Sequence, residues 1–197
     1  MNSNNSNRKC KDLQYEIKKI YEENFLEERK KIISIATKLI TELKGILTKE
    51  NESSNEYNWI LKSFIDNWIW KISELPGPNT KTKFVGQRYW SKKAKEQYQK
   101  NCNYKGLRHE HVYPRAKLKE RIIECENNEE IEKELRKIVA CVVTKEEHNK
   151  LNNEKERWER YVSTGVQVVD LFENKELTDE DLRKLNRKEN SYDCYID

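Results

Sequence analysis

Glycine is scarce in this chain, and the positions of the few glycines exclude two kinds of nucleotide site. There are 5 glycines among 197 residues, and no two lie within two positions of each other. None is followed by Lys-Ser or Lys-Thr. Phosphate-binding loops and dinucleotide-binding turns need glycines at set positions so that the backbone can approach a phosphate. The sequence therefore predicts neither.

Long apolar runs and paired cysteines are also missing. The longest clean apolar run, Ile138 to Val143, is too short to span a bilayer. Met1 to Asp12 is rich in Asn and Ser and has no apolar core, so neither secretion nor membrane contact is expected. The 5 cysteines are scattered and never spaced Cys-x-x-Cys, which argues against a disulfide framework or a four-thiolate zinc site. We expect a reduced, cytoplasmic protein in which the thiols are bystanders.

Charge is distributed unevenly along the chain. Residues 81–120 contain twelve basic and three acidic side chains, a net charge of +9, whereas the whole chain carries +4. Six aromatic residues are interleaved with these cations. Cations contact phosphates and aromatic rings stack on bases, so the block favours a nucleic-acid partner. The alternative is a solvated helix face over ordinary core aromatics. The cations expected to contact nucleic acid are Lys92, Lys93, Lys105, Arg115 and Lys117.

Two apolar patterns in the first half of the chain predict a helical hairpin. From Leu13 to Leu47, apolar residues recur every three or four positions, as in one long helix or a broken pair. A second stripe runs from Tyr57 to Leu75, and Pro76-Gly77-Pro78 ends it. Such stripes usually form a core. We therefore assign these helices a structural role, with association with a second copy or a protein partner as a further use.

All 3 histidines lie in two short segments. Leu107 to Pro114 is expected to be short and extended, and it contains His109 and His111. The third histidine, His148, follows the β-branched run from Ile138 to Val143, which is expected to be a buried strand.

A helix is expected to begin directly after that strand. Thr144 and Glu147 have the spacing of a capping box, in which each side chain accepts a hydrogen bond from the other residue's backbone. Asn152 lies four positions after His148 and therefore on the same helix face. A strand, a second strand and a capped helix can bring Glu110, His111, His148 and Asn152 around one ion.

The two segments resemble the HNH (ββα-metal) endonucleases, including the colicin-type DNases. In that family the first strand ends in an acidic residue or histidine, a catalytic histidine, an aliphatic residue, any residue and proline. Glu110-His111-Val112-Tyr113-Pro114 follows that order. The family's second strand runs into a Thr and a helix that carries a metal-binding histidine and a further polar ligand one turn later. The residues Thr144, His148 and Asn152 match it, and the resemblance covers Leu107 to Asn153.

The resemblance implies a role for each matching residue. His111 would be the general base that activates water against a phosphodiester, and Arg108 or Arg115 would brace the phosphate. Glu110, His148 and Asn152 would hold one divalent cation, either Mg²⁺, Mn²⁺, Ni²⁺ or Zn²⁺. In an extended strand, however, alternate side chains point to opposite faces. His109 is therefore an alternative ligand to Glu110.

These observations predict a mainly α fold with a small β-hairpin. We expect a flexible leader (1–12), a helical hairpin region (13–78), an HNH-like ββα-metal nuclease domain with a basic lead-in (79–161) and a C-terminal extension (162–197). The expected function is metal-dependent hydrolysis of nucleic acid, with DNA favoured over RNA. The alternatives are a non-catalytic nucleic-acid- or partner-binding protein with a degenerate HNH-like unit, and a helical interaction protein whose histidines are incidental.

Overall fold

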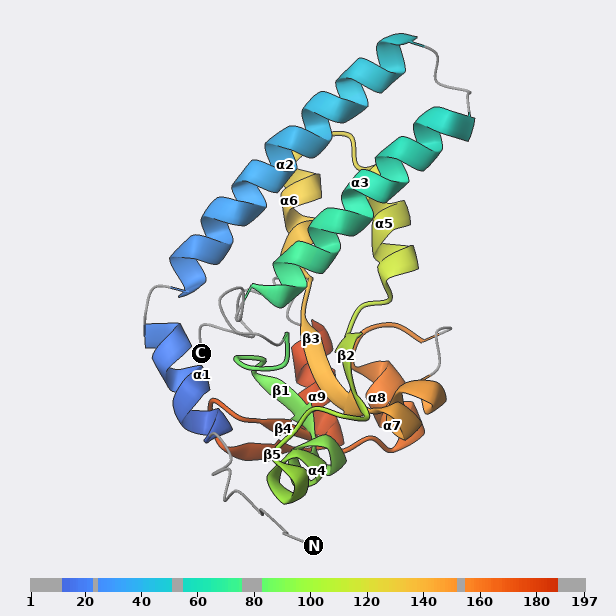
Figure 1. The fold of residues 1–197 in the computed structure, drawn as a ribbon. Coiled ribbons are helices and arrows are strands. Elements are labelled where there is room, and N and C mark those ends of the chain that lie inside the picture. Colours follow the sequence, from blue (N-terminus) through green and yellow to red (C-terminus); the bar gives the residue numbers. More distant parts are fainter. Residues whose placement is uncertain (1–11, 23–24, 51–54, 76–82, 152–154, 188–197) are drawn as a thin grey trace, which may run out of the picture.

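The structure is a computed structural model that describes residues 12–22, 25–50, 55–75, 83–151 and 155–187, with the side chains of 48–50 excepted. Three predicted features lie outside these residues: the leader up to residue 11, the Pro76-Gly77-Pro78 terminator and Asn152. Figure 1 shows a long helical hairpin that projects away from a small sheet, and shorter helices that flank the sheet.

The elements follow one another along the chain as a mixture of helices and short strands. In order, they are α1 (Leu13–Glu22), α2 (Phe25–Glu50), α3 (Asn55–Glu74), β1 (Tyr89–Ser91), α4 (Lys92–Asn101), β2 (Leu107–His111), α5 (Arg115–Glu124), α6 (Asn128–Arg136), β3 (Ala140–Thr144), α7 (Lys145–Lys150), α8 (Glu159–Thr164), β4 (Val168–Asp170), β5 (Lys175–Leu177) and α9 (Asp179–Arg187). The prediction of a mainly helical chain is confirmed.

The described strands form one sheet with the order β2-β3-β1-β4-β5, in which β1 is parallel to β3 and the other neighbours are antiparallel. The expected strand pair is present as β2–β3, and it belongs to a sheet that is larger than the small hairpin expected. β1, β4 and β5 are three residues long each, too short for an alternating pattern to stand out in the sequence. β4 and β5 belong to the segment expected to be a C-terminal extension, so that segment completes the sheet.

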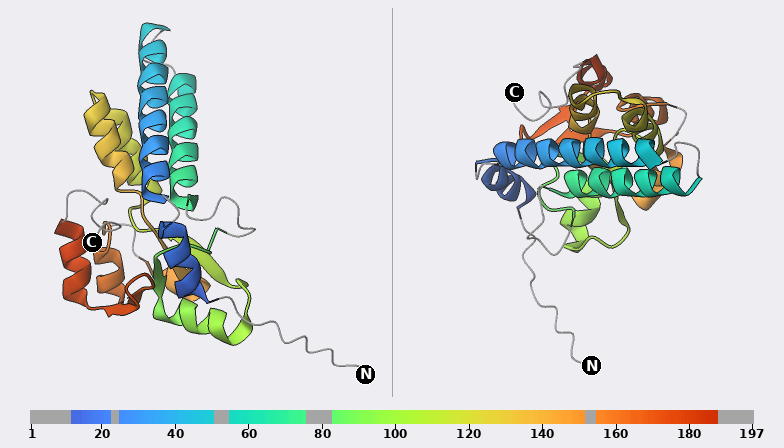
Figure 2. Two further views of the ribbon diagram at one scale, coloured as in Figure 1. Left: turned by 90° about the vertical axis from the view of Figure 1, so that its left-hand side faces the viewer. Right: turned by 90° about the horizontal axis from the view of Figure 1, so that it is seen from above.

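The helical hairpin is formed as expected, with a break between α1 and α2. Both views in Figure 2 show α2 and α3 side by side. Their buried isoleucines, including Ile33, Ile40, Ile65 and Ile69, share one core with Leu118 of α5 and side chains of α6. The hairpin therefore packs on the two helices that connect β2 with β3.

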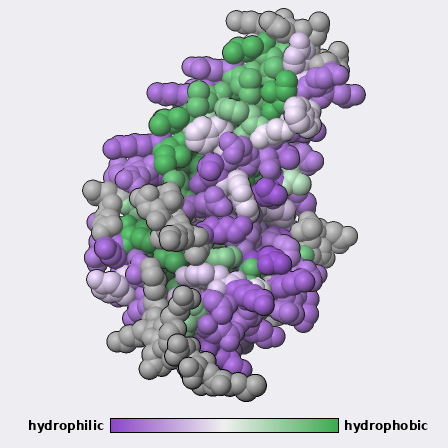
Figure 3. All heavy atoms as spheres, in the orientation of Figure 1, coloured by the Kyte–Doolittle hydropathy of each residue, from purple (hydrophilic) through white to green (hydrophobic). Residues whose placement is uncertain are grey.

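The outer face of the hairpin carries apolar side chains. Figure 3 shows apolar surface along α2 and α3. The large exposed apolar residues of these two helices are Ile35, Leu39, Ile46, Trp59 and Ile60. Association of the N-terminal helices with a second copy or a partner stays a prediction. None of the described helices is long and apolar enough to cross a membrane.

The sheet has two differently covered faces, and this positions the candidate site. On one face, Cys141 and Val143 of β3 pack with Trp158, Tyr161 and Leu182, next to α8 and α9. On the other face, Val142 packs with Trp90 and with side chains of α1 and α4. Residues directly opposite each other in an antiparallel pair point to the same face. The β2–β3 register therefore fixes the direction of each β2 side chain.

One cysteine departs from expectation. Cys102, the residue that ends α4 in a left-handed conformation with φ of 48°, is disulfide-bonded. The prediction that all the thiols are bystanders is therefore wrong for Cys102. Cys125 and Cys141 are free, and burial raises the pKa of both thiols.

Candidate functional site

The β2, β3 and α7 segments form the strand-strand-helix arrangement on which the predicted site depends. All five residues of β2 pair with β3, from Leu107 opposite Thr144 to His111 opposite Ala140. α7 begins directly after β3. The predicted capping box is confirmed: Thr144 Oγ1 accepts from Glu147 N at 3.1 Å, and Glu147 Oε2 accepts from Thr144 N at 3.0 Å.

The capping box is itself anchored to the sheet. Glu147 is buried, and its Oε2 also accepts a hydrogen bond from Ser91 Oγ at 2.5 Å, at the end of β1. The first turn of α7 therefore has little freedom to rotate or slide. This fixes where the next residue, His148, projects from the helix.

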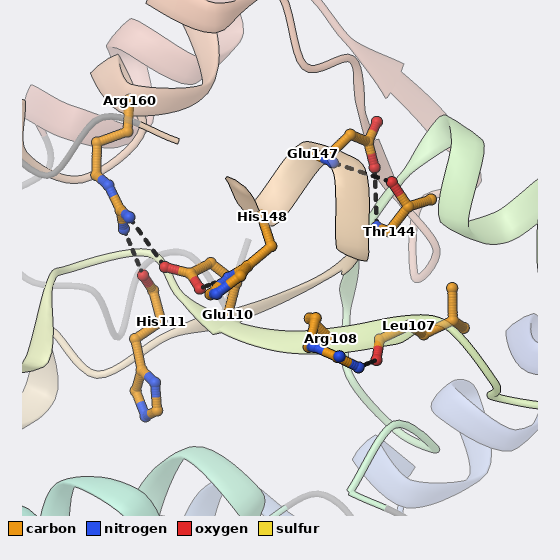
Figure 4. Close-up of polar contacts among 8 residues, drawn as sticks. All are labelled: Leu107, Arg108, Glu110, His111, Thr144, Glu147, His148 and Arg160. Carbon is orange, nitrogen blue, oxygen red and sulfur yellow. Dashed lines mark hydrogen bonds and ion pairs between the residues drawn. The ribbon is translucent and has the colours of Figure 1, made fainter. Parts of the chain in front are cut away.

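Glu110 and His148 come together, as the sequence predicts. Glu110 lies opposite Cys141 and therefore points to the α8 face of the sheet. Its Oε2 lies 2.6 Å from His148 Nδ1, the distance of a short hydrogen bond in which the ring nitrogen donates. Figure 4 shows the two side chains meeting above β2. The His148 side chain is 44% exposed and that of Glu110 12%, so the pair borders solvent.

Arg160 of α8 holds the other side of Glu110, and the sequence analysis did not identify it. This arginine is buried, with 2% exposed. Its Nη2 donates to Glu110 Oε1 at 3.0 Å, and its Nη1 donates to the carbonyl oxygen of His111 at 2.9 Å (Figure 4). Arg160 lies between Trp158 and Tyr161, which are core residues, and no spacing rule links it to Glu110. Only the tertiary fold reveals its role.

His109 and His111 point to the opposite face of β2, toward α3. The His111 ring stacks on Trp70, with ring centroids 5.0 Å apart, and the His109 ring meets the edge of the same indole at 5.5 Å. His109 Nε2 lies 3.2 Å from the Ser73 carbonyl oxygen. Both histidines are buried, and His111 Nε2 has no hydrogen-bond partner in the described part of the chain.

This environment keeps both imidazoles neutral. Burial lowers the pKa of His109 to about 4. Burial also holds the pKa of His111 well below its usual value, and the nearby cations Arg115, Lys83 and Arg160 lower it further. A neutral imidazole is the protonation state that a general base needs, but this ring is enclosed against Trp70.

The expectation that His111 and His148 face each other across one gap is therefore wrong in this conformation. The physical reason is strand alternation: His111 is the last residue of β2 and follows Glu110, so the two side chains leave opposite faces. His109 shares the face of His111, and the alternative in which it replaces Glu110 beside His148 is wrong for the same reason. Asn152 lies outside the described residues.

Glu110 and His148 are thus the pair of predicted ligands that the structure brings together. Among the described residues, no group of three or more His, Cys, Asp or Glu side chains could hold a metal ion. One carboxylate and one imidazole at a solvent border suit a cation that keeps water molecules and gains further oxygen ligands from a bound phosphate. The residue types of the pair suit the implied divalent cation, which would replace the proton that His148 Nδ1 shares with Glu110 Oε2.

The predicted nucleic-acid-binding cations fall into two groups. Lys92 pairs with Glu176 at 3.0 Å, Arg115 with Asp66 at 3.1 Å and Lys117 with Glu156 at 3.4 Å. Lys93 and Lys105 are exposed and make no ion pair with another described residue. Arg108 is also exposed, and its Nη1 donates to the Leu107 carbonyl oxygen of its own strand at 3.0 Å.

Comparison with family models, with curated proteins and with solved structures found no match.

Proposed function

We propose that the protein is a metal-dependent endonuclease of the HNH type that hydrolyses phosphodiester bonds, with DNA favoured over RNA. The observation that supports this proposal best is the contact between Glu110 and His148. These residues lie 38 positions apart, yet a strand pair and a capped helix bring their polar atoms to 2.6 Å at the protein surface. The pair occupies two of the three positions at which the resemblance implies metal ligands.

Glu110 and His148 would hold one divalent cation in this proposal. Such an ion neutralises charge on the scissile phosphate and on the leaving oxygen. Arg160 is a positioning residue, because its two hydrogen bonds hold the Glu110 carboxylate and the strand end together. Arg108 projects on the same face as Glu110, two residues away along the strand, and is available to a phosphate.

His111 stays the proposed general base, and this role requires the end of β2 to rearrange, because the His111 side chain leaves the strand on the face opposite Glu110. The ring is retained by stacking on Trp70, and its Nε2 makes no hydrogen bond within the described residues. Releasing the ring from Trp70 therefore costs packing but no bond at Nε2. Since Arg160 donates to the carbonyl oxygen of His111, a rearrangement of the strand end would also shift that hydrogen bond.

A second candidate function is non-catalytic binding of nucleic acid by a degenerate HNH-like unit. Two observations favour it: the His111 ring faces Trp70, and Arg160 already offsets the negative charge of Glu110. A binding protein needs neither a mobile base nor a strongly held cation.

Cleavage of supercoiled plasmid in Mg²⁺, Mn²⁺ or Ni²⁺, with an EDTA control, separates the two functions. The endonuclease proposal expects cation-dependent nicking that falls about 10²–10⁴-fold in His111→Ala, the range for loss of a general base. Nicking should also fall in Glu110→Gln and His148→Ala. Glu180→Gln, on the exposed side of α9, is the matched control and should cut normally. Failure of the folded wild type to cut with any of the cations, while it still binds DNA, would favour the second function.

A further inference from the structure

Three exposed cations lie next to one another at the end of the β2–β3 pair that is distant from His111. Lys145 N donates to the Gly106 carbonyl oxygen at 2.9 Å, which places Lys145 beside Lys105. Leu107 pairs with Thr144, and the next residue of β2, Arg108, pairs with Val143. The three side chains therefore come from two distant segments that the sheet joins.

Like the exposed Lys93, these three cations form no ion pair with a described acidic residue. Lys92, Arg115 and Lys117, by contrast, are each neutralised by a carboxylate within 3.4 Å. An unpaired, solvated cation can contact a phosphate without first giving up a protein partner. Lys105, Arg108 and Lys145 are therefore unpaired cations that the β2–β3 strand pair and α7 gather at one end of the sheet.

Two of the three cations, Arg108 and Lys145, also flank the Glu110–His148 pair. Arg108 and Glu110 are two residues apart on one strand and so share a face, separated by about 7 Å along the strand. Lys145 and His148 are three residues apart on α7 and so share a helix face. The neighbouring acid, Glu146, is about 100° around the helix from Lys145 and is turned away from that face.

We propose that Lys105, Arg108 and Lys145 form a phosphate-contacting surface that binds the backbone of duplex DNA beside the Glu110–His148 pair. This inference rests on the proposed function for its choice of DNA. It goes further by naming the cations that contact the DNA phosphates and those that do not. The surface contacts phosphates, so it orients the duplex without reading its sequence.

The test is the salt dependence of duplex binding, measured by fluorescence anisotropy in EDTA so that no cleavage occurs. Each phosphate contact contributes about 0.9 to the slope of log affinity against log salt. Replacing all three cations by Gln should lower that slope by about 2.7. Between 50 and 200 mM salt, the wild type should then lose about 40-fold more affinity than the triple variant. The matched control replaces the paired Lys92, Arg115 and Lys117 by Gln, and its slope should change much less.

The outcomes are distinguishable from those of the cleavage assay. Equal slopes for the wild type and the Lys105/Arg108/Lys145 variant would overturn the surface, even if the plasmid is still cut. A larger slope change in the control variant, or binding to duplex RNA but not to duplex DNA, would overturn it as well. The expected slope change in a protein that never cuts would support the surface and contradict the endonuclease.

Discussion

Replacing Arg160 by Met should reveal how strongly the Glu110 carboxylate depends on its buried partner. Arg160 is 2% exposed and makes two hydrogen bonds, one to Glu110 and one to the His111 carbonyl oxygen. Removing one member of a buried ion pair leaves the other charge without compensation and costs about 3–5 kcal/mol. Because Glu110 keeps its contact with His148, we expect the lower part of that range, about 3 kcal/mol.

Urea unfolding followed by circular dichroism measures this cost. With a slope of about 2–3 kcal/mol per molar, a loss of 3 kcal/mol moves the midpoint by about 1 to 1.5 M. The matched control is Arg183→Met, which removes a half-exposed arginine from its 3.7 Å pair with Glu159. Exposed pairs contribute about 0–1 kcal/mol, so the control should lose less than 1 kcal/mol.

A double variant decides whether the cost comes from the orphaned carboxylate. Replacing both members of a buried pair by apolar residues is often close to neutral. Glu110→Leu combined with Arg160→Met should therefore be more stable than Arg160→Met alone. If Arg160→Met costs no more than the Arg183→Met control, or if the double variant is the less stable one, the described contact between Arg160 and Glu110 is refuted.

Three further changes test the surroundings of the site. The pKa of His109 is lowered to about 4 by burial, whereas an unfolded histidine titrates near 6.5, so the unfolded chain binds the proton first. The contribution of His109 to stability should be complete above pH 6.5 and fall by the order of 3 kcal/mol as the pH drops to 4, and the buried His111 adds a loss in the same direction. His109→Asn should remove the His109 share of this loss in urea unfolding at stepped pH. Gly165 has φ of +66° and open space around its new Cβ, so Gly165→Ala should cost about 1–2 kcal/mol of backbone strain. Gly106→Ala should destabilise the fold more, because φ is +84° and Gln97 Nε2 lies only 2.9 Å from the new Cβ. Equal midpoint shifts for the two variants would contradict this. Thr144→Ala should cost about 1 kcal/mol by removing the α7 cap, and Thr144→Ser should restore it.

Local sequence rules predicted the elements whose stabilising contacts are short-range. The predicted Thr144–Glu147 capping box is formed, since it needs only residues three positions apart. The start of α6 is of the same kind, because the Asn127 side chain accepts from Glu130 N three positions along. Helix ends of this kind are encoded locally, and so the sequence alone reveals them.

The sheet could not be predicted in the same way. β1 pairs with β3 in parallel, with Tyr89 opposite Cys141, and with β4 on its other side. A three-residue strand has too few positions for alternation to be detected, and its partners are chosen by the tertiary core. The same limit explains why Arg160 was missed: it lies 50 positions from Glu110 and is selected by the fold.

The sequence motif alone could not decide to which face of β2 the His111 side chain points. Adjacent residues of a regular strand point to opposite faces, and β2 stays regular through its final residue. A bulge or an earlier strand end would have directed Glu110 and His111 to one side. Whether the strand ends before or after His111 depends on its pairing with Ala140, which only the three-dimensional structure displays.

The central claim is that Glu110 and His148 together bind a divalent cation. Isothermal titration of the folded protein with Mn²⁺ tests it most directly, with Glu110→Gln and His148→Ala compared against Glu180→Gln. The account predicts one binding event per chain in the wild type and in Glu180→Gln, weakened at least tenfold in each of the other two variants. Equal affinity in all four proteins, or no binding by the wild type, would contradict it.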